Sequence, residues 1–344
     1  MVFLQFLLWP FSWLYGSVML IRNKAFDWGW FEQKKVDVHV ISVGNLSTGG
    51  TGKSPFVQWL AQILPEKQTG ILSRGYKRQS KGFLWVESTS TATDVGDEPL
   101  MHKLKLPHTA VAVCEKRVIG AQRMVNENPR LRYLVLDDAF QHRHIKRDLN
   151  IMLSRFDRPF FNDWVLPSGQ LREFKSGCKR AHVVIFTHCE PHISQAQIDF
   201  YRQKTLPFCV EVLFGRTQTG PLLDRHGNAV SNEPKKALLL AGMAQPYRFR
   251  KTIETQFPNM VVVCKFFADH HLYSEMDFQK MLEESLEFCS GQIITTQKDW
   301  ARIPQKWKQH PQLNWGILPL SFGFLFDGEK TMRKLLEKHT NLPL

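Results

Sequence analysis

The segment Ser47-Thr-Gly-Gly-Thr-Gly-Lys-Ser54 lies between the mostly apolar run 38–43 and the amphipathic run 56–64. This order predicts a strand, a glycine-rich loop and a helix. In such a loop, glycines let backbone N–H groups face an anion, the lysine reaches the outer phosphates, and the serine hydroxyl can hold Mg²⁺. The sequence therefore predicts a nucleotide-binding loop with the candidate residues Ser47, Thr48, Gly49, Gly50, Thr51, Gly52, Lys53 and Ser54.

The loop departs from the usual phosphate-loop pattern at one position, because Ser47 stands where that pattern has glycine. A structural glycine-rich turn is the alternative, but the flanking strand and helix patterns favour nucleotide binding. Two carboxylates, Asp137 and Asp138, end the apolar run 131–136. In phosphate-loop enzymes such a strand delivers an aspartate to Mg²⁺, so we predict Ser54, Asp137 and Asp138 as metal ligands. An ordinary strand-end turn is the alternative for the two aspartates.

Apolar runs that alternate with helical stretches recur along the rest of the chain. They cover residues 38–43, 69–73, 131–136, 149–153, 181–186, 236–240, 260–266, 292–296 and 315–318. Such runs suit strands buried on both faces, and the intervening helices imply right-handed crossovers. We therefore predict an α/β fold of the P-loop NTPase type: a mostly parallel sheet flanked by helices, a second smaller α/β domain and an N-terminal apolar helix.

A tract rich in Gly, Pro, Asn and Asp divides the chain at residues 217–234. We expect four parts: an N-terminal membrane-associated helix with its flank (1–34), a phosphate-loop core domain (35–216), a linker or β-ribbon (217–234) and a C-terminal α/β domain (235–344). In the last part, Ser274 and Asp277 predict a capping box at the start of a helix, and residues 330–338 predict a closing helix.

The chain has 344 residues, with 45 Lys and Arg against 32 Asp and Glu, and a formal net charge of +13. This basic balance favours nucleic acid, anionic lipid headgroups or phosphorylated substrates without choosing among them. The six cysteines form no C-x-x-C pair, so neither a zinc site nor a disulfide framework is expected.

Residues 2–21 are mostly apolar and are followed by Arg22 and Lys24. The segment is a membrane span, an interfacial helix or a core helix. Its length and its flanking charges favour association with a membrane.

Acidic and imidazole side chains follow other predicted strands. Asp97, in the turn 96–99, could accept a proton from a hydroxyl that attacks a terminal phosphate, or it could cap the following helix. Spacing alone favours the cap. Asp269, His270 and His271 cluster after a strand, where a structural role and a catalytic role are equally compatible with the pattern.

Basic loops are expected at the same edge of the sheet. Arg74 follows the strand 69–73, and His142 lies just beyond the aspartate pair. Arg172 and Glu173 stand in a loop that contains Pro and Gly. Because open α/β sheets bind ligands beyond the carboxyl ends of their strands, these four residues are candidate substrate contacts. A solvated basic loop is the alternative.

Eight motifs, taken in order, resemble those of the tetraacyldisaccharide 4'-kinase family, the lipid A 4'-kinases. They are GNLSTGGTGKSP (44–55), SRGY (73–76), GDEP (96–99), DDAFQH (137–142), LPSGQLRE (166–173), AG (241–242), FADHH (267–271) and TTQKD (295–299). The resemblance spans nearly the whole chain. The family usually has Gly where this chain has Ala139 and Glu where it has Gln297. Thr is common at the position of Ser54, which keeps the hydroxyl.

The resemblance implies a membrane-associated kinase of lipid A assembly. Such an enzyme transfers the γ-phosphate of ATP, with Mg²⁺, to the 4'-hydroxyl of tetraacyldisaccharide 1-phosphate, an acylated glucosamine disaccharide 1-phosphate, and forms lipid IVA. The resemblance assigns Asp97 as the catalytic base and Lys53 to the phosphates. It assigns one of the histidines after Asp269 as support for that base, and it favours His270 over His271. It also implies two α/β/α domains joined by a β-ribbon. The expected location is the cytoplasmic face of the inner membrane of a Gram-negative-type bacterium, beside anionic lipid.

Two other classes of protein fit parts of the sequence. A membrane-targeted ATPase switch shares the GGTGKS core, but its signature lysine would fall near Thr48 and is absent. A nucleic-acid-binding enzyme or a nucleotide kinase would use the basic surface, but the sequence has no aromatic-basic stacking motif of the RNA-binding type. We therefore expect no nucleic-acid partner and no obligate protein partner.

Overall fold

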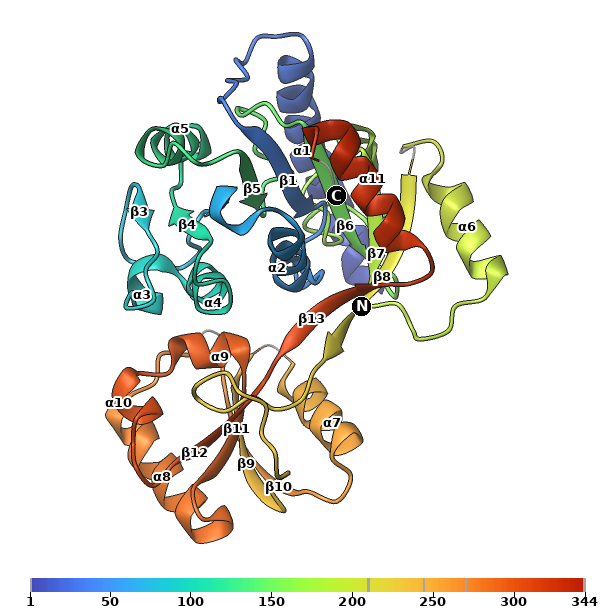
Figure 1. Ribbon diagram of the computed structural model, residues 1–344. Helices are drawn as coiled ribbons and strands as arrows, with labels where there is room; N and C mark the ends of the chain where they lie inside the picture. Colours follow the sequence, from blue (N-terminus) through green and yellow to red (C-terminus); the bar gives the residue numbers. More distant parts are fainter. Residues whose placement is uncertain (1, 209–210, 244, 270, 343–344) are drawn as a thin grey trace.

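The computed structural model describes residues 2–208, 211–243, 245–269 and 271–342. Two sheets with helices packed against them make up the described part of the chain (Figure 1). The nine-stranded sheet has the order β13-β8-β7-β6-β1-β5-β2-β4-β3, and the four-stranded sheet has the order β10-β9-β11-β12. We call the nine-stranded sheet with its covering helices the larger unit, and the four-stranded sheet with its covering helices the smaller unit.

The strands of the larger unit are β1 (His39–Asn45), β2 (Thr69–Ser73), β3 (Leu84–Trp85), β4 (Ala110–Val113), β5 (Tyr133–Asp137), β6 (Leu149–Arg155), β7 (Val183–Thr187), β8 (Glu211–Thr219) and β13 (Leu320–Phe324). Those of the smaller unit are β9 (Lys236–Gly242), β10 (Val261–Phe267), β11 (Gln292–Thr296) and β12 (Asn314–Leu318).

The α-helices are α1 (Val2–Asp27), α2 (Lys53–Ile63), α3 (Ala92–Val95), α4 (Asp97–Lys105), α5 (Arg117–Glu127), α6 (Gln195–Thr205), α7 (Pro246–Gln256), α8 (Glu275–Cys289), α9 (Gln297–Arg302), α10 (Gln305–Lys308) and α11 (Gly328–Thr340). Three short 3₁₀ helices are η1 (Glu66–Gln68), η2 (Phe160–Asn162) and η3 (Lys175–Arg180).

The predicted α/β fold is confirmed. Every neighbouring pair of strands is parallel except at the two edges of the larger sheet, where β3 and β13 run antiparallel to their neighbours. Each apolar run predicted as a strand forms one. Central strands such as β1, β5 and β7 are covered on both faces and need continuous apolar sequence, whereas β10 lies at its sheet edge and is largely exposed. The capping box of Ser274 and Asp277 starts α8 as predicted.

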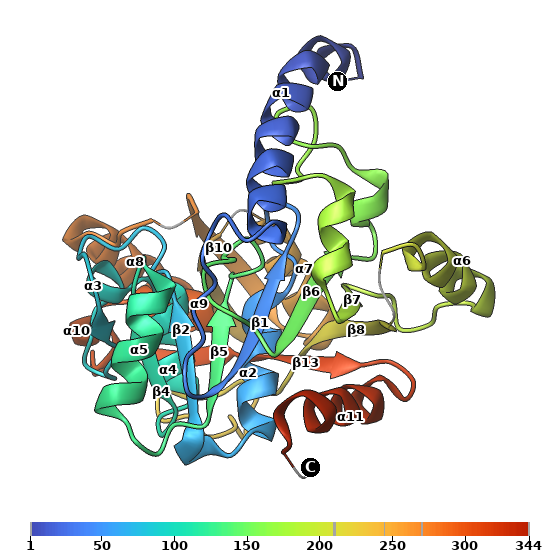
Figure 2. The same cartoon turned by 90° about the horizontal axis from the view of Figure 1, so that it is seen from above.

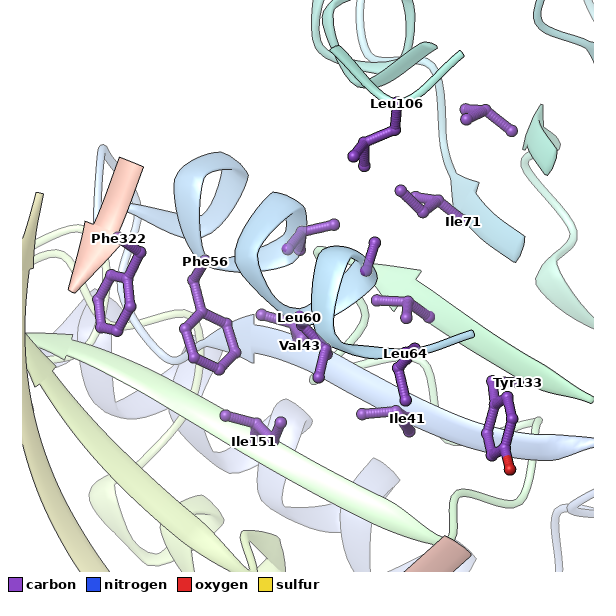
Figure 3. Packing of buried hydrophobic residues seen from close by; sticks show 14 of the residues in the cluster. Ile41, Val43, Phe56, Leu60, Leu64, Ile71, Leu106, Tyr133, Ile151 and Phe322 are labelled. Carbon is purple, nitrogen blue, oxygen red and sulfur yellow. The ribbon is translucent and has the colours of Figure 1, made fainter. Parts of the chain in front are cut away.

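The core beneath the phosphate loop packs α2 onto the centre of the larger sheet (Figure 3). Ile41 and Val43 of β1 face Phe56 and Leu60 of α2, and all four side chains are fully buried. Phe322 of β13 meets Phe56 edge to face, with ring centroids 5.1 Å apart. This packing holds the start of α2, and with it the loop lysine, in a fixed position.

The C-terminal segment differs from the expected division of the chain. We expected residues 235–344 to form one C-terminal domain, but β13 pairs with β8 of the larger sheet, and Met332 and Leu336 of α11 are buried in the core of the larger unit. The smaller unit is therefore inserted between β8 and β13. The sequence predicted a closing helix at residues 330–338, but this local pattern does not indicate which sheet the helix packs against. The other boundaries remain proposals.

Helix α1 contacts the larger unit along a narrow stripe of small and polar residues. Ser12 Oγ donates to Ser168 Oγ at 2.8 Å, and Asn23 Nδ2 donates to Glu173 Oε2 at 2.6 Å. Gly16 lies so close to Phe174 that an added Cβ would fall 2.5 Å from the ring. The helix projects from the body of the molecule toward its amino-terminal end (Figure 2). In the described ranges, no helix combines the length and the hydropathy needed to cross a membrane.

Candidate active site

The phosphate loop joins the end of β1 to the start of α2. Asn45 is buried at the end of β1, and its Oδ1 accepts a hydrogen bond from Lys53 Nζ at 3.4 Å. Gly52 precedes α2 with a φ of 74°, a left-handed conformation that glycine adopts without strain. A Cβ added to Gly49 or Gly50 would meet nothing within 4 Å, so the middle of the loop is open to a ligand.

A second loop, residues 166–173, lies against the phosphate loop. The backbone N–H of Thr48 donates to the Gln170 carbonyl oxygen at 2.8 Å. This contact places Arg172 beside Asp138, with 3.2 Å between the guanidinium Nη1 and the carboxylate Oδ1. Two segments that were predicted separately, as a nucleotide loop and as a substrate loop, are therefore neighbours.

Asp138 lies between two basic side chains just beyond β5. Lys53 Nζ is 3.5 Å from Asp138 Oδ1, the same oxygen that Arg172 Nη1 contacts at 3.2 Å. Burial opposes ionisation of this carboxyl, but the charges of Lys53 and Arg172 outweigh it and lower the pKa of Asp138. Asp138 also has a φ of 49°, which is uncommon for a residue with a side chain. The ionised carboxylate thus holds two cationic groups at the mouth of the phosphate loop.

Asp137 ends β5 and is only 1% exposed. Its Oδ2 lies 3.4 Å from His102 Nε2, while its Oδ1 is buried without a hydrogen-bond partner among the described residues. A buried carboxylate oxygen without a partner suits a Mg²⁺ ligand, because Mg²⁺ prefers oxygen donors. Burial, and next the charge of Asp137, raise the pKa of Glu98. A cation bound beside Asp137 would oppose this effect on Glu98.

The protein side chains alone do not complete a set of Mg²⁺ ligands without the phosphates of a nucleotide. Across the described ranges, no group of three His, Cys, Asp or Glu side chains converges into a metal site. Mg²⁺ at kinase sites usually keeps waters and phosphate oxygens beside one or two carboxylates. Asp137 and Asp138 could fill that place together with Ser54, which lies in the first turn of α2.

Asp97 lies where the two units meet. It begins α4, is 6% exposed, and its Oδ1 accepts a hydrogen bond from the backbone N–H of Glu98 at 3.0 Å. Lys298 of α9 reaches Asp97 Oδ2 at 3.6 Å and also Asp269 Oδ1 at 3.6 Å. Asp97 from the larger unit and Asp269 from the smaller unit thus share one lysine. His270, the predicted support for Asp97, lies outside the described residues.

The neighbouring His271 is described. Its Nε2 lies 2.9 Å from Asp277 Oδ2 at the start of α8, and its ring stacks on Phe267. These contacts give His271 a role in joining β10 to α8.

His142 lies among basic side chains, four residues beyond Asp138. Burial, followed by the charges of Arg117 and Arg74, lowers the pKa of His142 to about 4. Arg117 is 3% exposed and donates through Nη1 to the Cys114 carbonyl oxygen at 2.6 Å. Burial lowers the pKa of Arg117 to about 10, so the guanidinium remains charged at pH 7. The region therefore presents positive charge with a neutral imidazole, an arrangement that suits an anionic group.

Glu173 has a different environment from the one expected of a substrate contact. It is 2% exposed, and its carboxylate accepts hydrogen bonds from Asn23 of α1, from Gln141 at 3.1 Å and from Arg180 at 2.8 Å. All of these partners belong to the protein itself. A substrate contact by Glu173 stays a prediction, and the structure favours an anchoring role for α1 instead.

Sequence reasoning missed four residues of this site. Lys298 and Glu98 stand inside motifs 295–299 and 96–99, so their position in those motifs was an available signal. Asn45 also stands within the motif of the phosphate loop, but asparagine at a strand end is usually structural. Arg117 belongs to no motif, and only the structure places it beside Asp137, where its Nη2 lies 3.4 Å from the backbone oxygen.

A phosphate loop, an adjacent aspartate pair and a separate buried aspartate at a two-unit interface define a phosphate-loop kinase. The family model described as "Tetraacyldisaccharide-1-P 4'-kinase" matches residues 4–341. The chain belongs to this family.

Curated relatives and a solved structure agree with that placement. The tetraacyldisaccharide 4'-kinase of Cytophaga hutchinsonii is 37% identical over 341 residues, covering 98% of this chain and 97% of the relative. The protein of the same name from Phocaeicola vulgatus is 36% identical, covering 94% of this chain and 92% of the relative. The crystal structure of LpxK from Aquifex aeolicus in complex with ATP has a TM-score of 0.76 and 29% identity, and covers 98% of this chain and 99% of that one.

Proposed function

We propose that this chain transfers the γ-phosphate of ATP to the 4'-hydroxyl of tetraacyldisaccharide 1-phosphate and thereby forms lipid IVA in lipid A biosynthesis. The observation that carries the proposal is the placement of Asp97. This buried carboxylate lies at the unit interface, 3.6 Å from Lys298. Burial and then the charge of Asp137 raise the pKa of the adjacent Glu98, whereas the charge of Lys53 lowers it. A proton acceptor and a phosphate-binding lysine therefore belong to one site.

In the proposed reaction the backbone of residues 47–53 and Lys53 hold the phosphates of ATP. The Asp97 carboxylate accepts the proton of the 4'-hydroxyl as the new O–P bond forms and the bond from the γ-phosphorus to ADP breaks. Mg²⁺, when bound by Asp137, Asp138 and Ser54, would neutralise charge on the phosphates. Arg172 and Lys53 both pair with the Asp138 carboxylate through its Oδ1, which favours its charged form.

We further propose that α1 lies on the membrane surface. Its contacts with the larger unit use Ser12, Gly16 and Asn23, whereas much of the remaining helix surface is apolar and exposed. The exposed large residues of the described side chains of α1 are Leu7, Trp9, Phe11, Trp13, Leu14, Tyr15, Val18, Leu20 and Ile21. An apolar surface with several aromatic residues fits the boundary between headgroups and acyl chains, where the acylated acceptor lies.

The net charge of +13 supports docking on anionic lipid, and the proposed location is the cytoplasmic face of the inner membrane. Arg74, His142 and Arg172 remain the proposed contacts to the anionic acceptor.

The test is transfer of radiolabelled γ-phosphate to the acylated disaccharide 1-phosphate in mixed micelles. The native protein should form labelled product, and Lys53→Ala should lose it because the phosphates lose their counter-charge. Lys67→Ala, which changes an exposed lysine outside the site, should keep native activity. ATP turnover that depends on a protein partner and yields no labelled lipid would instead support an ATPase switch.

A further inference from the structure

Helix α4 carries a histidine that faces the carboxyl end of β5. His102 is 0% exposed, and its Nε2 lies 3.4 Å from Asp137 Oδ2. Asp137 is itself 1% exposed, so this contact is closed to water. The ring belongs to a helix of the larger unit, and the carboxylate belongs to a central strand of its sheet. The proposed reaction assigns no role to this histidine.

The imidazole of His102 stands in an apolar part of the larger unit. Leu100 of α4 and Leu106, just after this helix, belong to the same buried core as Leu60 of α2 (Figure 3). A polar ring in such a core costs free energy unless its nitrogens are paired, and His102 Nδ1 has no hydrogen-bond partner among the described residues. An apolar side chain would fill the position without that cost. The position therefore uses the nitrogen that faces Asp137.

The contact decides which ring nitrogen carries the hydrogen. A carboxylate oxygen only accepts hydrogen bonds, so the nitrogen that faces Asp137 must donate, and the hydrogen is on Nε2. The imidazole then engages one of the two carboxylate oxygens. The other oxygen, Oδ1, is buried and has no partner within the part of the chain that the structure describes. The carboxylate cannot turn without losing its hydrogen bond to His102, so Oδ1 is kept in one direction.

The same helix carries the proposed base. Asp97 begins α4, five residues before His102. At a rise of about 1.5 Å per residue, the two residues lie about 7.5 Å apart along the helix axis. The contact of His102 with Asp137 thus holds α4 against the end of β5, and it also fixes the helix that presents Asp97.

We propose that His102 is a positioning residue for the metal ligand Asp137: its Nε2–H holds Oδ2, and this leaves Oδ1 directed at the place that Mg²⁺ would take. The inference rests on the proposed function and adds to it a histidine that acts on the metal through Asp137 without touching the nucleotide. Removing a hydrogen bond that orients a ligating carboxylate lowers metal affinity by about 10- to 100-fold. His102 therefore affects how tightly a nucleotide is held with Mg²⁺ and has little effect on a nucleotide held without it.

The test compares binding of a non-hydrolysable ATP analogue in Mg²⁺ with its binding in EDTA, by titration calorimetry on the full-length protein. The native protein should bind the analogue more tightly in Mg²⁺. His102→Leu should weaken binding in Mg²⁺ about tenfold and leave binding in EDTA within about twofold of native. His102→Gln should recover part of the loss, because its amide N–H can take the place of Nε2–H. His108→Leu, which changes an exposed histidine shortly after α4, should match the native protein in both solutions.

Native binding by His102→Leu in Mg²⁺, an equal loss in both solutions, or no recovery by His102→Gln would overturn the proposal. If His102→Leu fails to fold, His102→Asn takes its place, because the shorter amide corresponds to Nδ1 and does not reach Oδ2. The phosphate-transfer assay keeps the two hypotheses apart. Transfer to the lipid by the native protein, with Mg²⁺-dependent binding that is indifferent to His102, rejects only the positioning role. Binding that depends on Mg²⁺ and on His102, in a protein that forms no labelled lipid, rejects only the proposed function.

Discussion

Lys298 Nζ lies 3.6 Å from Asp97 Oδ2 and joins a side chain of the smaller unit to the proposed catalytic base of the larger unit. The same ammonium group is 3.6 Å from Asp269 Oδ1. One lysine therefore links the two units beside Asp97, the residue proposed to accept the proton of the acceptor hydroxyl.

Asp97→Asn should lower the rate of phosphate transfer by about 10²- to 10⁴-fold, the range expected when a general base is removed. ADP affinity should remain native, because the phosphates are held by the loop and not by Asp97. Asp94→Asn, which changes an exposed aspartate of α3, serves as the control. Native transfer by Asp97→Asn would exclude Asp97 as the base.

Lys298→Ala should reduce kcat about tenfold while the KM for ATP stays near native, because the lysine orients Asp97 and does not contact the phosphates. Lys298→Arg should recover part of the loss, since it keeps the charge. Lys306→Ala, which removes an exposed lysine of the same unit, should have no effect. A change confined to KM, with no recovery by arginine, would contradict this positioning role.

Leu14→Glu and Ile21→Glu should each weaken binding to vesicles that contain anionic lipid. These side chains are 68% and 63% exposed, and burying an aliphatic side chain of this size contributes about 1.5–3 kcal/mol. Co-sedimentation would therefore show at least a tenfold loss. Leu206→Glu changes a residue that is 75% exposed on the distant α6 side and should bind vesicles normally. Equal loss in all three variants would count against α1 as the contact.

Glu173→Ala should lower the free energy of unfolding by about 3 kcal/mol, because it leaves the mostly buried guanidinium of Arg180 without its carboxylate partner. Glu329→Ala breaks an exposed pair with Arg333 and should cost less than about 1 kcal/mol. Urea unfolding measures both. Native stability of Glu173→Ala combined with a raised KM for the lipid acceptor would restore Glu173 as a direct substrate contact.

His142 should make the protein less stable as the pH falls. The pKa of His142 is about 4 in the folded state, against about 6.5 in an unfolded chain. Between these values the unfolded state binds a proton that the folded state does not, so the free energy of unfolding falls by about 2 kcal/mol at pH 5 relative to neutral pH. His142→Gln should remove this part of the pH dependence in urea unfolding, whereas His192→Gln should leave it unchanged. Identical pH profiles for both variants would contradict the prediction.

The sequence predicted the fold well because its central strands are apolar throughout. β1, β5 and β7 are buried along almost their full length, and their nearly continuous apolar composition identifies them as buried strands. β4 has only four residues, and β13 is half-buried at the sheet edge, so neither has a distinctive pattern. The destination of α11 depends on contacts across the whole chain, which local spacing does not contain.

The site was predictable only in pieces. Lys53 and Asp138 could be paired in advance because a loop and a strand of known relative position carry them. The contact of Lys298 with Asp97 joins residues of different units. The burial of Glu173 could not be distinguished from the partial exposure of its neighbour Arg172 without knowing that α1 contacts Glu173. Such side chains acquire their environment from elements that are distant in the chain.

Because the smaller unit is inserted between β8 and β13, two chain connections join it to the larger unit. Both connections run side by side as an antiparallel pair, with Leu320 opposite Thr219 and Phe324 opposite Gly215. Any relative displacement of the units must twist or bend this pair, since neither strand can lengthen alone. Separation of the two units therefore requires this pair to deform, and a stiffer pair would slow any step that depends on such a separation without altering a side chain of the proposed site.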